Sequence, residues 1–87
     1  MKHVEARPYA DPAAAARRLV ELTASIQAIN GRIHIEKINA PFLFALSGKG
    51  SEFGAGLRFA IQRGWIELHE SGTYVRLLTP GEDLLVR

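Results

Sequence analysis

The chain has 87 residues, of which 47 % are hydrophobic and 23 % charged, a composition close to that of ordinary globular domains and unlike that of disordered or fibrous chains. Its length predicts one domain, its apolar runs are too short to cross a bilayer, and the lack of cysteine excludes disulfides and thiolate zinc sites. No apolar leader stands near the start of the sequence, so we expect a cytoplasmic protein.

The net charge of +2 is unevenly distributed along the chain. Residues 31–63 carry five basic and two acidic groups, whereas residues 64–87 carry two basic and four acidic groups. The small net charge does not by itself indicate nucleic-acid binding, but the basic middle segment is a place where an anionic partner would bind.

Residues 1–10 are expected to form a flexible N-terminal segment ahead of a single domain over residues 11–87. Asp11-Pro12 predicts a helix start, because Asp caps helix N-termini and Pro fits the first turn. Good helix formers follow as far as Asn30-Gly31, which predicts the stop. One apolar stripe is expected along this helix, formed by Ala15, Leu19, Leu22, Ile26 and Ile29.

The run RIHIEKI, residues 32–38, alternates apolar and polar side chains and predicts a short strand with Ile33 and Ile35 on its buried face. Asn39 then predicts the cap of a second helix, APFLFAL, with Pro41 tolerated in its first turn. The segment SGKG is expected to end this helix after one or two turns.

Ser51 predicts the cap of a third helix over residues 52–63. Its inward face is expected to hold Phe53, Leu57, Ala60 and Ile61. Gly54 and Gly56 each destabilise a helix interior by about 1 kcal/mol relative to Ala, so we expect tertiary packing to hold this helix together.

Gly64 is expected to end the third helix in the left-handed conformation, and a hairpin follows. A two-residue Ser71-Gly72 turn pairs Glu70 with Thr73 at the tip. Further down it pairs Ile66 with Leu77, Glu67 with Arg76, Leu68 with Val75 and His69 with Tyr74, which places the aliphatic residues inward and an ion pair outward. Thr79-Pro80 predicts the start of a short last helix.

The segments AIQRGWIE and RLLTPGEDLL resemble the close of the winged-helix module of MarR-type bacterial regulators, where a recognition helix ends in glycine and a hydrophobic wing follows. This resemblance implies an α+β winged helix-turn-helix fold of order α-β-α-α-β-β-α with a small antiparallel sheet. MarR-type proteins carry long extra helices for dimerisation, and this sequence has room for only about two turns after the wing. The dimer and ligand pocket of that family are therefore not expected.

The resemblance also implies that the third helix enters the major groove of DNA, as expected of a transcriptional regulator. Arg58 is suited to guanine and Gln62 to adenine, although Arg58 is equally an ordinary solvated arginine. The base-edge candidates are Ser51, Arg58 and Gln62. The phosphate candidates are Lys49, Arg32, Lys37, Arg63 and Arg76, and the Gly48-Lys49-Gly50 segment reads equally well as a plain flexible turn.

The wing is less basic than a DNA-contacting wing should be, because Glu67 and Glu70 stand on or near its outer face. His69, Glu70 and Tyr74 are expected at its tip, where His69 and Tyr74 suit contact with a sugar or a protein surface, although such residues on a hairpin are more often ordinary exposed side chains. The alternative function is a protein-protein interaction module that binds no DNA. The flank of the first helix with Ala14, Ala24 and Ala28 would suit a homodimer, although alanine is equally a plain helix former.

The sequence contains no pattern of residues that is typical of a catalytic site. The three histidines are scattered, with no helical metal spacing, and no nucleophile elbow is present. We therefore expect no enzyme activity, no metal and no cofactor. Trp65 is expected to anchor the core between the third helix and the hairpin.

Overall fold

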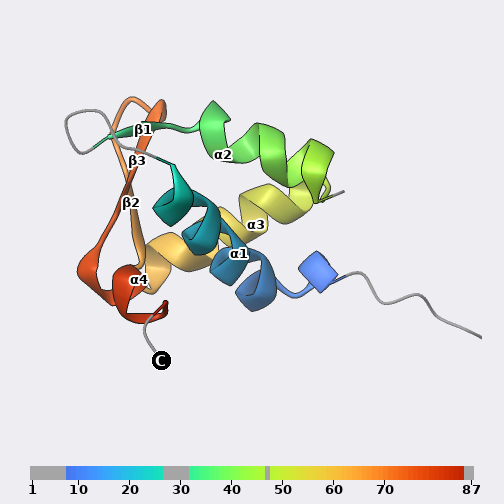
Figure 1. Ribbon diagram of the computed structural model, residues 1–87, viewed down its shortest axis with the longest axis horizontal. Helices are drawn as coiled ribbons and strands as arrows, with labels where there is room; N and C mark the ends of the chain where they lie inside the picture. The colour runs from blue at the N-terminus through green and yellow to red at the C-terminus, as the bar shows by residue number, and fades with distance from the viewer. Residues whose placement is uncertain (1–7, 27–31, 47, 86–87) are drawn as a thin grey trace, which may run out of the picture.

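The computed structural model describes residues 8–26, 32–46 and 48–85 (Figure 1). These residues form an α+β structure with four α-helices and a small antiparallel sheet. In chain order the elements are the 3₁₀ turn η1 (Pro8–Ala10), helix α1 (Pro12–Ser25), strand β1 (Ile33–His34), helix α2 (Glu36–Ala40), the π-helical turn η2 (Pro41–Ala45), helix α3 (Gly50–Gln62), strands β2 (Ile66–Leu68) and β3 (Tyr74–Leu77), and helix α4 (Thr79–Asp83).

Helix α1 begins as predicted, because the Asp11 carboxylate accepts a hydrogen bond from the N–H of Ala13 at 3.1 Å. It ends at Ser25, earlier than predicted, and Ile26 already has extended backbone. The Ser25 hydroxyl donates to the carbonyl of Leu22, and the N–H of Ile26 donates to Thr23, which closes the last turn. The predicted stop at Asn30-Gly31 lies outside the described residues.

The predicted strand over residues 32–38 is wrong beyond His34, and Asn39 does not cap a helix. The N–H of Ile35 bonds to the carbonyl of Thr73 in the hairpin, while the Ile35 carbonyl accepts from both Ile38 and Asn39. Ile35 is therefore the last residue held by the sheet and the N-cap of α2. Pro41 lacks an N–H, and the helix continues past it as a π-turn closed by the N–H of Leu46 on the Pro41 carbonyl.

Helix α3 begins one residue before Ser51, so the prediction of Ser51 as its cap is wrong. Lys49 is the N-cap, and its backbone N–H donates to the Glu52 carboxylate at 2.9 Å. The prediction that Ile61 faces inward is also wrong, because 36 % of its surface is exposed. Spacings of three and four residues instead give a buried face of Phe53, Gly56, Leu57 and Ala60.

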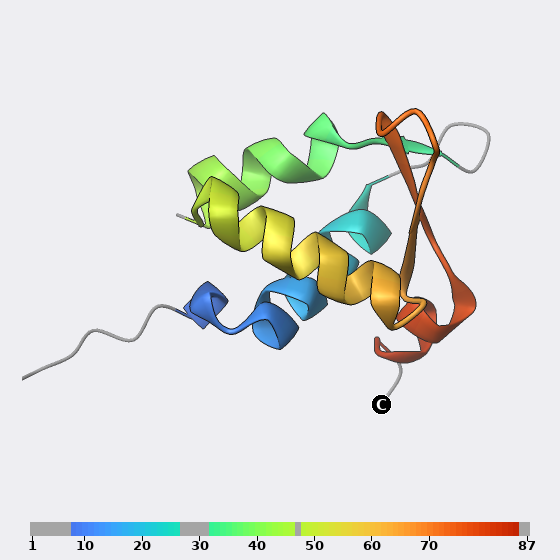
Figure 2. The ribbon, with the colours of Figure 1, turned by 180° about the vertical axis from the view of Figure 1, so that it is seen from behind.

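The packing of α1 on α3 forms the centre of the core (Figure 2). A Cβ atom built on Gly56 would lie 2.7 Å from the Cβ of Ala15, so glycine permits the close approach of the two helices. The buried core residues are Ala15, Ala16, Leu19, Val20, Ile33, Ile38, Phe42, Phe53, Leu57, Ala60, Ile66 and Val75. Tyr9 from η1 also packs on Phe42, with a centroid separation of 5.0 Å. Tertiary contact thus offsets the weak propensity of the glycine-containing helix.

The hairpin has the predicted strand register, with the pairs Ile66–Leu77, Glu67–Arg76 and Leu68–Val75. Gly64 has φ +73°, which confirms the left-handed helix end. The predicted two-residue turn is wrong, because the N–H of Gly72 donates to the carbonyl of His69 and centres the turn on Glu70 and Ser71. Four residues therefore connect His69 to Tyr74, whose carbonyl accepts from the N–H of His69.

Strand β1 pairs with β3, so the sheet order is β1-β3-β2 and the sheet stands at one end of the helices (Figure 1). Helix α4 begins at Thr79 with Leu78 as its cap, one residue earlier than predicted. Trp65 is half-buried and packs on Phe59 with ring centroids 5.7 Å apart, as expected of a core anchor. None of the helices in the described ranges combines the length and apolar character needed to cross a membrane.

Candidate nucleic-acid interface

The three base-edge candidates lie in one exposed stripe of α3. Ser51, Arg58 and Gln62 are all exposed, and their spacings of seven and four residues place them on the same side of a helix. Between them stand Gly54 and Ala55, both half-buried and without polar side-chain groups. Since the opposite face of α3 packs on α1, this stripe is the side on which a partner can reach the helix.

Two predicted phosphate ligands stand at the ends of the same helix. Lys49 is exposed at the N-cap, and Arg63 is exposed at the C-cap with its guanidinium carbon 4.8 Å from the ring centroid of Phe59. Within the described ranges, no carboxylate forms an ion pair with Lys49, Arg58 or Arg63. None of these three charges therefore has to leave a carboxylate of the described ranges before it acts on an external anion.

The other predicted phosphate ligands lie on different elements. Arg32 and Arg76 belong to the outer face of the sheet, and Arg76 donates to Glu67, which confirms the cross-strand ion pair expected from the register. Lys37 lies in the first turn of α2, where it lines a shallow surface hollow with His34. The structure thus divides the expected set of cations among three places.

A row of three rings crosses the outer face of the sheet. His34 on β1 pairs with Tyr74 on β3, and the rings lie 5.7 Å apart with an interplanar angle of 80°. His69 follows β2 on the other side of Tyr74, at 5.9 Å and 87°. All three residues are partly exposed. The sequence predicted that His69 lies beside Tyr74, but it did not predict that His34 lies there too. The alternation of His34 with two isoleucines indicated an outward side chain. Its position next to Tyr74 follows only from the pairing of β1 with β3.

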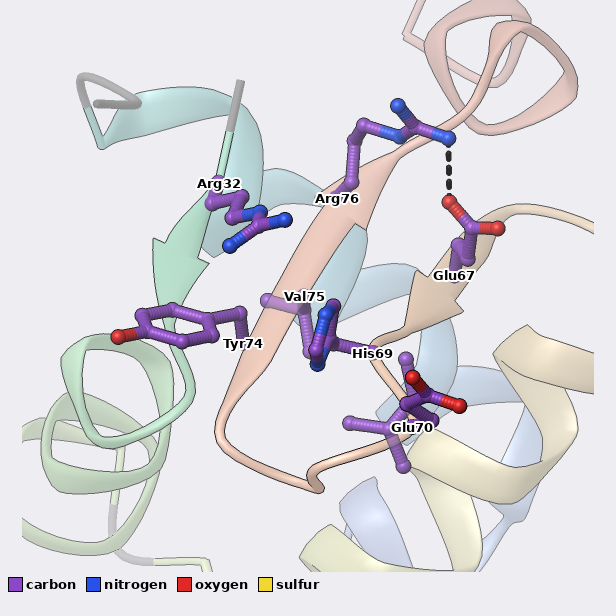
Figure 3. Close-up of a pocket in the computed structure, with 8 residues that line it drawn as sticks. Arg32, Glu67, His69, Glu70, Tyr74, Val75 and Arg76 are labelled. Carbon is purple, nitrogen blue, oxygen red and sulfur yellow. Dashed lines mark hydrogen bonds and ion pairs between the residues drawn. The ribbon is translucent and has the colours of Figure 1, made fainter. Parts of the chain in front are cut away.

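A row of charges lies beside the row of rings, two residues further along each strand. Since Ile33 pairs with Val75, Arg32 stands opposite Arg76, which in turn pairs with Glu67. The guanidinium carbon of Arg32 lies 5.5 Å from the ring centroid of Tyr74. Figure 3 shows Arg32 beside Tyr74 and Arg76 directed toward Glu67. The outer face is therefore organised as rings next to guanidinium groups.

Hydrogen bonds order the tip of the hairpin. The N–H of Ser71 donates to Nδ1 of His69 at 3.1 Å, and the N–H of Thr73 donates to the Ser71 hydroxyl oxygen at 3.2 Å. On β1, the N–H of Glu36 makes a longer bond of 3.4 Å to Nδ1 of His34. Nδ1 of each imidazole thus contacts a backbone N–H, and Nδ1 of His69 also lies 2.8 Å from the Ser71 hydroxyl oxygen.

The described residues contain no cluster of three or more His, Asp or Glu that would hold a metal ion. Comparison of the chain with protein-family models, curated proteins and solved structures gave no significant match. The chemistry of the exposed surfaces therefore provides the basis for a functional proposal.

Proposed function

We propose that the protein is a small winged-helix DNA-binding protein, a transcriptional regulator that places α3 in the major groove. The observation that carries this proposal is the exposed stripe of Ser51, Arg58 and Gln62 on a helix whose other face is buried. An α-helix fits the major groove, where arginine reads guanine and glutamine reads adenine.

The element order and the β1-β3-β2 sheet support the winged-helix interpretation, because they place a strand, a helix pair and a hairpin in the order this architecture requires. The charges at the ends of α3 support contact with the DNA backbone. Lys49 stands where the N-terminus of α3 presents N–H groups, and Arg63 extends the positive surface past the C-terminus. The wing contributes less, because Glu67 already occupies Arg76.

Fluorescence polarisation with labelled duplex DNA across a salt series tests the proposal. If Lys49 and Arg63 each neutralise one phosphate, log K falls against log salt with a slope of about −1.8. Arg58→Gln should weaken binding by about 1–3 kcal/mol if it contacts a base edge. Arg17→Gln removes the same charge from an exposed position on α1 and is the matched control, for which we expect little change. Absence of duplex binding at about 50 mM salt would overturn the proposal.

A second function, docking to a protein, is favoured by one observation. Phe44 in η2 is 83 % exposed, and an aromatic side chain in that position is typical of binding surfaces rather than of solvated helix faces. On the alanine flank of α1, Ala24 is exposed and Ala14 half-buried, while Ala28 lies outside the described residues. Affinity capture from nuclease-treated lysate with the wild type and Phe44→Ser distinguishes the functions, since a partner bound through Phe44 survives nuclease and is lost with the variant.

A further inference from the structure

The outer face of the sheet carries a hollow that lies apart from the α3 stripe. It is an open hollow of about 580 Å³ over β2 and β3. Figure 3 shows the side chains around it. Its polar and aromatic lining comes from β2, β3, the hairpin tip and the residue before β1, namely Arg32, Glu67, His69, Glu70, Tyr74 and Arg76.

The lining combines aromatic rings with charged side chains. Tyr74 and His69 provide two aromatic rings in edge-to-face contact, with centroids 5.9 Å apart and planes nearly perpendicular. Arg32 provides a positive charge beside Tyr74, and no carboxylate in the described ranges forms an ion pair with it. Glu67 and Glu70 provide hydrogen-bond acceptors, with Arg76 balancing the charge of Glu67.

We propose that this hollow binds one nucleotide unit of a single-stranded nucleic acid, with the base against the rings of Tyr74 and His69 and the phosphate at Arg32. The rows of rings and charges lie two residues apart along the strands, or about 6.6 Å. A base and its phosphate are likewise separated by a single sugar. The carboxylates of Glu67 and Glu70 would accept hydrogen bonds from amino or imino groups of the base edge.

A single strand fits this site better than a duplex because a base must leave its stack before it can pack on a side-chain ring. A single phosphate pairs with Arg32, the guanidinium of this lining that no carboxylate in the described ranges engages, whereas Glu67 and Glu70 would repel further phosphates. The inference does not rest on DNA binding by α3, since the two surfaces share no residue. It adds a second nucleic-acid site of a different kind.

Fluorescence anisotropy with labelled oligothymidylate and oligouridylate, each of about twelve residues, tests the site and separates DNA from RNA. With one phosphate neutralised, we expect a shallow salt slope of about −0.7. Tyr74→Leu should weaken binding at least about fivefold, and Tyr74→Phe, which keeps the ring, should stay within about twofold. Arg32→Gln should remove most of the salt dependence. Arg17→Gln removes the same charge from an exposed position on α1, outside both surfaces, and is the control that should leave single-strand affinity unchanged.

Two further measurements keep the test independent of folding defects. Far-UV circular dichroism establishes that each variant is folded. Photocrosslinking of the wild-type chain to a strand containing 5-iodouracil, followed by peptide sequencing, should label Tyr74 or His69. No single-strand binding at about 50 mM salt, equal affinity of wild type and folded Tyr74→Leu, a slope of about −1.4 or steeper, or crosslinks confined to α3 would each overturn the proposal.

Discussion

The contact between Gly56 and Ala15 predicts that Gly56→Ala destabilises the protein, although helix propensity alone predicts the opposite. Gly54 and Gly56 both lie inside α3, and replacing either with alanine should stabilise an isolated helix by about 1 kcal/mol. In the folded protein the two positions differ. A Cβ atom on Gly54 would come no closer than 3.7 Å to another group, the Arg58 guanidinium, whereas one on Gly56 would meet Ala15 at 2.7 Å.

The magnitude follows from how far the helices must separate. Carbon atoms pack at about 3.5–4.0 Å, so Gly56→Ala requires α1 and α3 to move apart by about 1 Å. The backbone of Ala15 and Ala16 also lies within 3.2 Å of the added atom, so no side-chain rotation relieves the clash. Overpacking of this kind costs about 1–3 kcal/mol, and after the gain in propensity we expect a net destabilisation of about 1–2 kcal/mol. Gly54→Ala should stabilise by about 0.5–1 kcal/mol.

Urea unfolding followed by far-UV circular dichroism measures the difference between the variants. With a slope near 1 kcal/mol/M, a gap of about 2 kcal/mol separates their midpoints by about 2 M. In thermal unfolding the same gap corresponds to about 8–16 °C. The comparison uses the same substitution in the same helix, so changes in the unfolded state largely cancel.

A double-mutant cycle identifies the contact responsible. Ala15→Gly removes the methyl group that the new side chain of Gly56→Ala would meet. Ala15→Gly should therefore destabilise the Gly56→Ala variant less than it destabilises the wild type. We expect a coupling energy of about 1 kcal/mol between the two substitutions. If Gly56→Ala proves as stable as Gly54→Ala, or if the cycle gives no coupling, the helices do not approach as closely as described and the reasoning is refuted.

The remaining predictions concern two phenylalanines and an ion pair. Phe42→Ala should lower the free energy of unfolding by about 3–5 kcal/mol, because Phe42 is fully buried. Phe44→Ala should change it by less than about 0.5 kcal/mol, because the Phe44 side chain is 83 % exposed. Similar urea midpoints for the two variants would contradict this assignment of buried and exposed rings. Glu67→Gln should cost less than about 1 kcal/mol, since both partners of its pair with Arg76 are more than half exposed. That loss should shrink in about 1 M salt, and a larger, salt-independent loss would show a role other than charge pairing.

Of the two exposed surfaces described above, the sequence predicted the α3 stripe but not the arrangement on the sheet. The stripe of Ser51, Arg58 and Gln62 depends only on helical spacing, so it was predicted from the sequence. The placing of Arg32 beside Tyr74 depends on the pairing of β1 with β3, strands separated by some forty residues. Two paired residues of β1 carry too little pattern to reveal such a partner.

Local chemistry by itself determined the start of α1 at Asp11, the left-handed end of α3 at Gly64 and the register of the hairpin. Each depends on hydrogen bonds or alternation between residues close in the chain. Only the tertiary structure decided where α2 begins, because the bond from Ile35 to Thr73 ends the strand there. It likewise decided which face of α3 is buried: the face that holds Gly56 packs on Ala15 of α1, and Ile61 lies off that face and is exposed.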